Sequence, residues 1–332
     1  MILSIGITSY NRVSELDRCL KSIKTKYKDE IEIIVSEDKS PKRELIREVV
    51  SRFQESTEYK VVFNTNQDNL GYDRNLKKLI ELASGKYILY MSDDDALIDG
   101  MLDKLIDKLL ELNVGVVYSG FAQGENDYRR YYKTSFFIPS GEEYAKKHIE
   151  DSILFSGLVF NVEVVKKLKA EEFLNKNYFQ VYMFLYALYK YGGYYVSLPL
   201  VNAVGDGENG FGISDSSEKN ELLANRNSVF SMLEFHKGLF WVIKKFDKDF
   251  NKNFFKEYQK EYNLRSISGM AIARKNSLRD LKTYWEKMKE LDYSVNIISK
   301  AYYIMLYVLG TDITMFLLRT PHIILKKVRK EN

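Results

Sequence analysis

Short apolar runs that do not alternate with polar residues constrain this chain more than any other feature. Residues 32–35 (EIIV) are typical, because such a run is buried when helices cover both faces of a sheet. Helical periodicity follows, as in residues 14–24, where Leu16, Leu20 and Ile23 fall on one face. Repeated strand–helix–strand units imply right-handed crossovers and a parallel sheet. The sequence therefore predicts an α/β fold for the N-terminal region.

The predicted elements divide the chain into two regions. Strands are expected over residues 2–8, 31–36, 59–63, 86–91, 114–119, 156–161 and 194–204, with an aromatic-rich extended segment over 128–138. Helices are expected over 14–24, 42–54, 72–83 and 177–190, with another from Glu163. Beyond residue 217 only helical periodicity remains, broken near Asn251, Asn276 and Asp292. We therefore expect a domain over 1–218, with a mixed, mainly parallel sheet flanked by helices, and an all-helical region over 219–332.

Polar residues cluster where the predicted strands end. Residues 8–12 follow the first strand, 37–40 the second and 93–95 the fourth, while 66–72 lie between the third and fourth. Ligands of parallel α/β sheets bind outside the carboxyl ends of the strands. These residues are therefore expected to converge into one site.

The triplet Asp93-Asp94-Asp95 carries the clearest chemical signal. Adjacent carboxylates raise one another's pKa values, and a divalent cation with oxygen ligands relieves the repulsion. A solvated turn is the alternative, which the preceding buried strand and the neighbouring polar strand ends disfavour. Leu97 and Ile98 exclude a helix–loop–helix calcium site, and the chain has neither a phosphate-binding glycine loop nor a dinucleotide fingerprint. The sequence thus predicts a nucleoside diphosphate held through Mn²⁺ or Mg²⁺.

Four motifs within residues 1–100 resemble those of family 2 glycosyltransferases of the GT-A fold, of the type that builds bacterial surface polysaccharides. They are ITSYNR (7–12), VSEDKS (35–40), NLGYDRN (69–75) and ASGKYILYMSDDD (83–95). The resemblance implies a GT-A (Rossmann-like) fold. It also implies transfer of a sugar from a UDP- or dTDP-sugar to a hydroxyl of a glycan or lipid-linked acceptor, with inversion.

The resemblance also implies roles for individual residues of the nucleotide site. Thr8 and Tyr10 would line the base, and Asp38 would accept a hydrogen bond from the ring N–H of uracil or thymine. Asp93 would contact the ribose. The other nucleotide-binding candidates are Asn11, Arg12, Asn69, Gly71, Arg74 and Asn75.

The resemblance also implies which residues bind the metal ion. Asp94 is the implied ligand of the cation that bridges the two phosphates, and another register of the triplet places Asp95 there. A cation at this point stabilises the charge that develops on the departing diphosphate.

The catalytic base is the main departure from the family pattern. The family places an acidic pair ahead of a helix well after the metal motif, and the matching residues 177–180 contain no carboxylate. Gln180 can orient an acceptor but cannot take a proton. Glu171, Glu172, Asp206 and Glu208 are nearby substitutes, of which none stands out.

Two other functions remain open at this point. A non-catalytic nucleotide-binding protein of glycosyltransferase-like fold would not need the base. A phosphatase with an aspartate nucleophile is the less favoured alternative: Asp93 and Asp95 would be its acid pair, and the pair then lacks the usual Thr or Val, since Leu97 follows.

Charge and apolarity indicate where the protein works. Residues 231–332 hold 20 Lys and Arg against 11 Asp and Glu, while the whole chain has a net charge of +4. The apolar run within residues 294–330 is expected to be too short to span a bilayer. It can lie in the membrane interface, with Lys326, Lys327, Arg329 and Lys330 toward anionic headgroups, or pack on the protein body.

The remaining composition narrows the compartment and the partners. One cysteine, Cys19, points to a reducing compartment, and the apolar start is too short for a signal peptide. We therefore expect a cytoplasmic protein, peripheral at the inner face of the plasma membrane. Its expected partners are the nucleotide-sugar and a glycan or lipid-linked acceptor, and no nucleic acid.

Overall fold

The computed structural model describes residues 1–124, 127–129, 132–169, 171–173, 176–207, 228–291 and 296–328, with the side chains of Leu198, Glu261 and residues beyond 318 left out. The chain forms two compact units, Met1–Ala224 and Asn225–Asn332. The boundary predicted between residues 218 and 219 lies outside the described residues.

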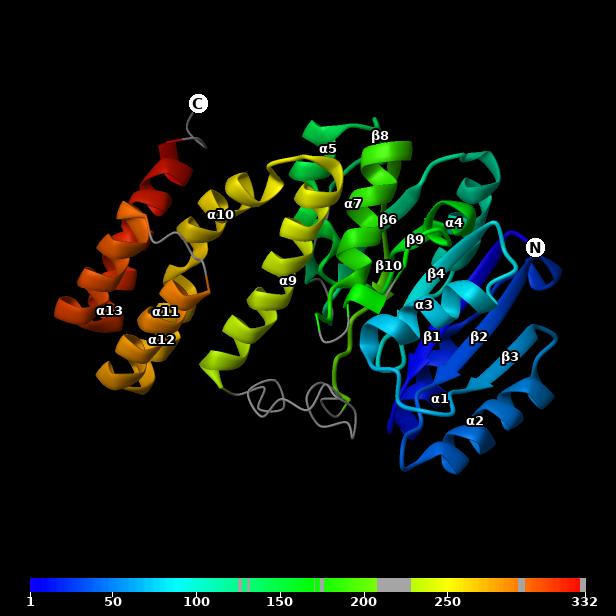
Figure 1. Cartoon of the computed structure of the whole chain (residues 1–332). Coiled ribbons are helices and arrows are strands. Elements are labelled where there is room, and N and C mark those ends of the chain that lie inside the picture. Colours follow the sequence, from blue (N-terminus) through cyan, green and yellow to red (C-terminus); the bar gives the residue numbers. More distant parts are fainter. Residues whose placement is uncertain are drawn as a thin grey trace. The chain divides into compact units, whose positions relative to one another are not determined.

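The first unit is built on a ten-stranded sheet with the order β3-β2-β1-β4-β9-β6-β10-β5, to which β7 and β8 add at β6 and β10 (Figure 1). The strands are β1 (Leu3–Ser9), β2 (Ile31–Glu37), β3 (Lys60–Thr65), β4 (Tyr87–Ser92), β5 (Ala96–Leu97), β6 (Val116–Ala122), β7 (Tyr128–Arg129), β8 (Phe136–Ile138), β9 (Val159–Asn161) and β10 (Gly193–Asn202).

Strand direction divides this sheet. Strands β3, β2, β1 and β4 are all parallel, as are β6 and β10. The short strand β9 runs antiparallel between β4 and β6 and joins the two parallel groups. The predicted mixed sheet is confirmed, and the insertion of β9 is what closes it into one layer.

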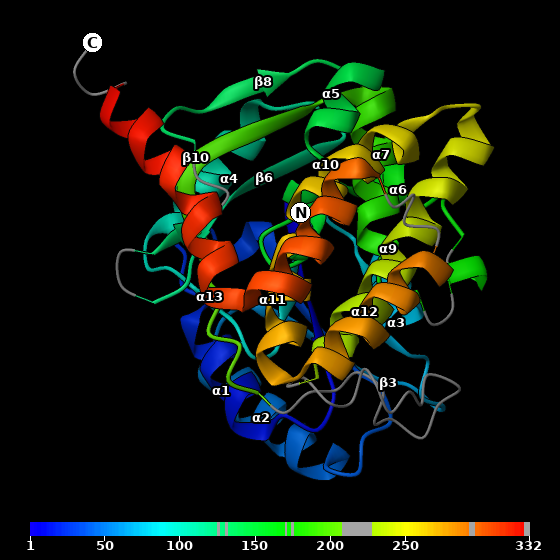
Figure 2. The same cartoon turned by 90° about the vertical axis from the view of Figure 1, so that its left-hand side faces the viewer.

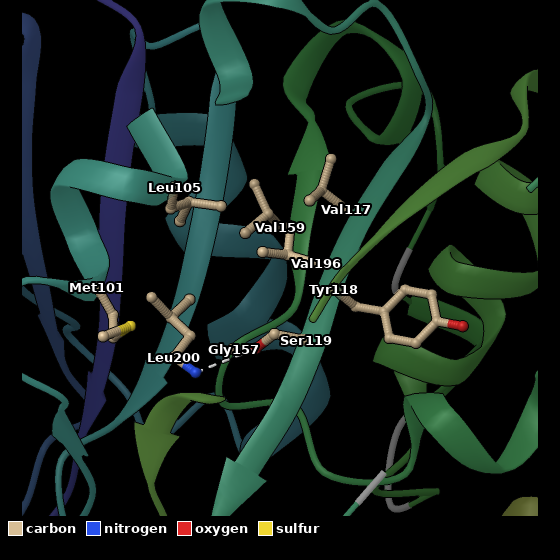
Figure 3. Close-up of a pocket in the computed structure, with 9 residues that line it drawn as sticks. All are labelled: Met101, Leu105, Val117, Tyr118, Ser119, Gly157, Val159, Val196 and Leu200. Atoms are coloured by element: carbon tan, nitrogen blue, oxygen red, sulfur yellow. Dashed lines mark hydrogen bonds between the residues drawn. The ribbon is translucent and has the colours of Figure 1, made fainter. Parts of the chain in front are cut away.

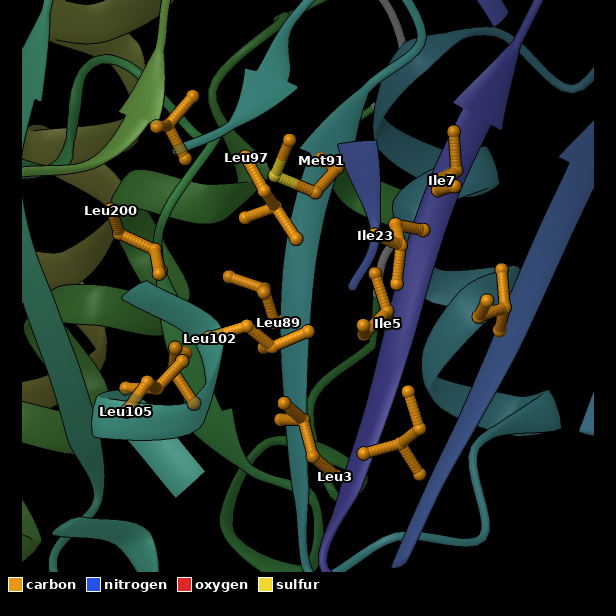
Figure 4. Close-up of a cluster of buried hydrophobic side chains, with 14 of the residues drawn as sticks. Leu3, Ile5, Ile7, Ile23, Leu89, Met91, Leu97, Leu102, Leu105 and Leu200 are labelled. Atoms are coloured by element: carbon orange, nitrogen blue, oxygen red, sulfur yellow. The ribbon is translucent and has the colours of Figure 1, made fainter. Parts of the chain in front are cut away.

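Helices cover both faces of the sheet. On one face, alternate residues of β1 (Leu3, Ile5 and Ile7) are fully buried against the helices (Figure 4). Each such side chain contributes roughly 2 kcal/mol through burial. On the other face Gly6 lets the Leu79 side chain pack close to the strand, because a Cβ at this position would lie only 3.3 Å from Leu79 Cδ1. The first face carries α1 (Val13–Ser22), α2 (Arg43–Ser56) and α4 (Met101–Glu111); α3 (Tyr72–Leu82) and α7 (Phe179–Tyr191) cover the second, with α5 (Glu142–Lys147) and α6 (Val162–Val165) against α7.

The second half of the first unit differs from the predicted elements in two places. The extended segment predicted over 128–138 consists of the separate strands β7 and β8. Strand β10 shifts its register on β6 between Val196 and Val201. Pro199 lies inside that interval and has no N–H to donate to the ladder, which accounts for the irregularity. Among its described residues the unit also has the short 3₁₀ helices η1 (Lys28–Glu30), η2 (Ile149–Ser152) and η3 (Glu171–Phe173).

The second unit is helical throughout its described residues. Helix α9 ends before Asn251, whose left-handed backbone (φ 51°) stops it, and Ser277 caps α12 by accepting from Asp280 N at 2.9 Å. These two breaks fall where the sequence predicts them, while Asp292 lies outside the described residues. The helices are α9 (Val229–Phe250), α10 (Phe254–Arg265), α11 (Ile267–Asn276), α12 (Leu278–Glu290) and α13 (Ile297–Val328).

Helix α13 is kinked at Gly310, which has a non-helical backbone (φ 75°, ψ 179°). Its first part packs along α11, where Arg274 Nε donates to the Leu306 carbonyl at 3.0 Å and Thr311 Oγ1 to that of Ala271 at 3.3 Å (Figure 2). By length and composition the stretch Ile297–Leu318 is long and apolar enough to cross a membrane, and only 11% of its most apolar window is buried. The expectation that this segment is too short is therefore wrong on that criterion, because only Lys300 and Asp312 are charged within the stretch.

Candidate active site

The ends of β1, β2 and β4 bring three of the four polar motifs together. Strand register places Thr8 beside both Ser36 and Ser92, so the residues that follow each strand meet at one edge. The Tyr10 N–H donates to Asp93 Oδ2 at 3.1 Å across 83 positions of sequence. Thr8, Tyr10, Asn11 and Arg12 are all half-buried there.

Asp93 lies deepest in this edge and is paired with Arg12. One guanidinium nitrogen, Arg12 Nη1, lies 2.9 Å from Asp93 Oδ1 and 3.0 Å from Asp94 Oδ2. Burial raises the pKa of Asp93 to about 7, and the nearby Arg12 charge opposes that rise. A cation close to Asp93 therefore favours the charged form of this buried carboxyl.

The other two carboxylates of the triplet are held differently. Asp94 accepts a hydrogen bond from the Ser92 hydroxyl, and its backbone carbonyl accepts one from Arg18 Nη2 at 2.9 Å. Burial raises the pKa of Asp95 to about 6, against hydrogen bonds from the Ser156 side chain and the Val204 backbone. The start of the segment after β10 therefore lies against the triplet.

Asp38 organises the loop between β3 and α3. Its carboxylate accepts from the backbone N–H groups of Leu70 and Gly71 at 2.8 and 2.9 Å, and from Asn66 Nδ2 at 2.9 Å. Burial raises its pKa above the usual value in spite of these bonds. Gly71 has φ 75°, a backbone that favours glycine. Several acceptor sites of Asp38 are thus already occupied by protein donors.

The remaining residues of the third motif hold the same loop from within. Asn75 is buried: its Nδ2 donates to the Ser36 carbonyl at 3.1 Å, and its Oδ1 accepts from Ser36 Oγ at 2.7 Å. Asn69 Nδ2 donates to the Asp38 carbonyl at 3.0 Å, and Arg74 Nε to the Leu70 carbonyl at 2.8 Å. The sequence predicts that these residues contact the nucleotide. In the structure their hydrogen bonds to other protein groups fix the shape of the loop.

The residues considered as the catalytic base do not lie together. Gln180 is buried, its Nε2 donating to the Ile153 carbonyl at 3.0 Å, and its Oε1 has no partner within the described part of the chain. Asp206 forms an exposed ion pair with Arg18, with the closest atoms 2.6 Å apart. Glu171 and Glu172 are exposed in η3, and Glu208 lies outside the described residues.

Asp73 is a residue whose role the sequence reading missed. It is buried in α3 and accepts from the backbone N–H groups of Asn177 and Phe179, both at 2.8 Å, so that it caps the start of α7. The available signal is its place on the apolar face of α3, three and seven positions before Leu76 and Ile80. A carboxylate on such a face needs a buried partner.

The donor set fits a divalent cation that shares its coordination with a ligand. Among the described residues, no three His, Cys, Asp or Glu side chains gather into a metal site by themselves. Mg²⁺ and similar hard cations commonly take one or two carboxylates and complete their shell with phosphate oxygens and water. Asp93 and Asp94, which share one guanidinium nitrogen, match that pattern.

A separate pocket lies between α4 and the sheet, where Leu105, Val117 and Val159 contribute apolar side chains (Figure 3). No charged side chain lines it, so nothing in it suits a diphosphate. The strand-end edge is the better candidate for the active site.

Part of the chain is similar to known glycosyltransferases. Residues 4–168 match the family described as glycosyl transferase family 2. Over 99 residues the chain is 32% identical to the abequosyltransferase RfbV of Salmonella typhimurium, covering 29% of each protein. Over 100 residues it is 30% identical to the GalNAc(5)-diNAcBac-PP-undecaprenol beta-1,3-glucosyltransferase of Campylobacter jejuni, covering 30% of this chain and 32% of that one. These matches thus span less than a third of the relatives' lengths.

The whole chain can also be compared by structure. The crystal structure of S. aureus TarS 1-349 in complex with UDP-GlcNAc superposes with a TM-score of 0.53 at 13% sequence identity, over 91% of both chains. This likeness extends the GT-A fold assignment well beyond the matched N-terminal residues.

Proposed function

Because residues 4–168 of this chain belong to glycosyl transferase family 2, we propose that the protein transfers a sugar from a nucleoside-diphosphate sugar to a glycan hydroxyl in polysaccharide biosynthesis. The observation that carries the proposal is the meeting of Asp93 and Asp94 with the ends of β1 and β2 at one edge of the sheet. That edge offers carboxylates that can bind a cation, a guanidinium that can bind phosphate, and half-buried side chains that can line the nucleobase.

The donor belongs to the uridine or thymidine class in this proposal. Asp38 would accept the ring N–H with the acceptor capacity that Leu70, Gly71 and Asn66 leave, and Thr8 and Tyr10 would line the base. Asp93 would contact the ribose. These assignments rest on the family resemblance and on the position of the four residues at one edge.

Metal dependence is part of the same proposal. Asp94, with Asp93 or Asp95, would hold Mn²⁺ or Mg²⁺, and the bound cation would stabilise charge on the leaving diphosphate. Arg12 and Arg18, beside the triplet, would add positive charge at the same place.

The reaction is proposed to invert the anomeric centre, with the acceptor deprotonated by a group that we leave unassigned. Gln180 cannot serve, since it is a neutral amide and buried. Asp206 would have to leave its ion pair with Arg18. Glu172 stays a candidate by its place in the chain alone.

The acceptor is proposed to be lipid-linked, with the second unit resting on the membrane surface. The name of the Campylobacter relative gives an undecaprenol-linked substrate for that protein. On α13 the side chains of Val308 and Phe316 are 70% and 69% exposed, and the chain after them is basic. Tyr307 is 41% exposed, and Lys282 Nζ lies 5.5 Å from the centroid of its ring, an aromatic and basic pair suited to a headgroup layer.

An interfacial position explains α13 better than a spanning one. The kink at Gly310 interrupts the helix, and the hydrogen bond from Arg274 holds its first part on α11. A span would place this arginine and α11 in hydrocarbon, at a large cost.

Isothermal titration calorimetry with UDP, in Mn²⁺ or in chelator, tests the site. We expect metal-dependent binding that Asp94→Ala weakens at least roughly tenfold, about 1.4 kcal/mol. Asp99→Ala is the matched control, because Asp99 lies five positions further along, after β5, and is exposed. Equal UDP binding by the Asp94 variant, or in chelator, would refute the metal role.

Turnover separates this proposal from the two alternatives. Release of nucleoside diphosphate from a nucleotide-sugar, with membrane extract as acceptor, is expected from a transferase. Binding without release would favour the non-catalytic protein, and hydrolysis of a simple phosphate ester would favour the phosphatase.

A further inference from the structure

Arg12 stands between the two carboxylates that the proposed cation requires. Its Nη1 atom is 2.9 Å from Asp93 Oδ1 and 3.0 Å from Asp94 Oδ2, so that one nitrogen bridges both side chains. All three side chains are largely buried, with exposed fractions of 11%, 3% and 8%. This bridge is a charge-assisted contact shielded from water, where such contacts are strong.

The segment after β10 keeps Arg12 in this position. A Cβ added to Gly207 would lie 2.6 Å from Arg12 Nε, so the backbone of that segment passes directly against the guanidinium. Asp206, one residue earlier, pairs with Arg18 of α1, the helix that begins directly after Arg12. The guanidinium is therefore packed in place as well as paired.

A divalent cation bound by both carboxylates would meet this guanidinium. Metal–oxygen bonds of about 2.1 Å would bring the ion to the oxygens that Arg12 Nη1 now contacts. Two like charges would then share one buried place, which is unfavourable unless the guanidinium gains another partner. A diphosphate is such a partner, because guanidinium groups bind phosphate oxygens in a bidentate manner.

We infer that Arg12 is a built-in counter-cation of Asp93 and Asp94, and that Mn²⁺ or Mg²⁺ joins these carboxylates only together with a nucleoside diphosphate, to which the guanidinium transfers. This inference rests on the proposed function. Arg12 is then a positioning residue that orders the binding. The cation alone meets carboxylates already paired with a guanidinium, and the nucleotide alone lacks its metal.

The test measures Mn²⁺ binding without nucleotide, by calorimetry or by the electron paramagnetic resonance signal of free Mn²⁺, at pH 8. Wild type is expected to bind Mn²⁺ weakly alone and tightly with UDP. Arg12→Gln removes the bridging charge and is expected to bind Mn²⁺ alone at least tenfold more tightly than wild type. It is also expected to bind UDP with Mn²⁺ at least tenfold more weakly.

Arg18→Gln is the matched control, since it removes the same charge from α1, the helix that begins directly after Arg12. Arg18 contacts the backbone carbonyl of Asp94 and the side chain of Asp206, and these contacts leave the Asp93–Asp94 bridge in place. An equal gain in Mn²⁺ affinity in this variant would overturn the inference, because general charge would then explain the effect.

Arg12→Lys keeps the inference testable if the Gln variant does not fold, which circular dichroism would reveal. A lysine keeps the charge but cannot bind two phosphate oxygens in a fixed fork. Its affinity for Mn²⁺ alone is expected to match wild type, with UDP–Mn²⁺ binding several-fold weaker. Wild-type binding of both would overturn the inference, as would an unchanged Mn²⁺ affinity in Arg12→Gln. If wild type does not bind UDP at all, the proposed function fails instead.

Discussion

At the scale of single residues, two buried carboxylates have pKa values shifted in opposite directions. Asp93 is buried with a raised pKa, and Arg12 only partly offsets the loss of water. Glu32 is equally buried, yet its pKa falls to about 2: burial alone would raise it, but Lys60, Ser4 and Ser84 together outweigh that cost. A cation bound beside Asp93 would therefore favour its charged form, whereas Glu32 is already stabilised in its charged form and contributes to the stability of the fold.

Glu32→Gln should reveal that stabilisation through its dependence on pH. The pKa of Glu32 is lower in the folded protein than in the unfolded chain, so its contribution is complete above about pH 4.5. It disappears as the pH falls toward 2. We expect the variant to lose about 2 kcal/mol in the free energy of unfolding at pH 7, a figure discounted because Lys60 is half-exposed.

Denaturant unfolding at pH 7, 5 and 3 would measure this loss. The difference between Glu32→Gln and wild type should narrow at pH 3. Glu58→Gln is the control, since Glu58 forms an exposed ion pair with Lys28 and should have little effect at any pH. A difference that stays constant with pH would contradict the assigned ionisation.

At the scale of elements, Asp73 couples two helices on one face of the sheet. It belongs to α3, which follows the loop that Asp38 holds, and it caps α7, the helix that carries Gln180. The loop beside the proposed nucleotide site and the helix that carries Gln180 are thus connected by one buried side chain.

Asp73→Ala should weaken that connection. Removing the cap leaves two buried backbone N–H groups of Asn177 and Phe179 without their acceptor, a loss of about 2 kcal/mol. Asp73→Asn keeps one carbonyl oxygen and should lose less. Urea unfolding measures both, and Glu81→Ala, at an exposed position of α3, is the control. Equal stability of the Ala variant and wild type would show that the cap contributes nothing.

At the scale of the whole molecule, the two units differ in the surface they offer. The sheet unit buries its apolar side chains against helices on both faces, whereas α13 of the helical unit exposes Ile304, Val308 and Phe316. Exposed apolar side chains beside a positive net charge suit an anionic lipid surface. Nucleotide chemistry and acceptor recruitment would then belong to separate units.

Vesicle co-sedimentation tests that division. We expect binding to vesicles of anionic lipid, reduced several-fold by the double variant Val308→Lys, Phe316→Lys, because two apolar side chains leave the interface. Leu110→Lys is the matched control, since Leu110 is 57% exposed on α4 of the other unit. UDP binding should be unchanged in all three proteins. Equal vesicle binding by the double variant and wild type would rule out α13 as the contact.

The sequence by itself determined the parallel strands β1 to β4, their helices and the edge where their polar ends meet. Each of these follows from local signals: buried runs without alternation, amphipathic periodicity, and the rule that ligands bind where parallel strands end. It also placed the helical breaks near Asn251 and Asn276, where backbone preference acts within a few residues.

Only the tertiary structure decided which side chains meet. Arg12 bridges two carboxylates about eighty positions away, Asp73 caps a helix about a hundred positions away, and β9 enters the sheet between β4 and β6. The burial of Gln180 and the ion pair of Asp206 with Arg18 likewise could not be predicted from the sequence. The physical reason is that such contacts depend on how whole elements pack, and short-range sequence patterns carry no information about distant partners.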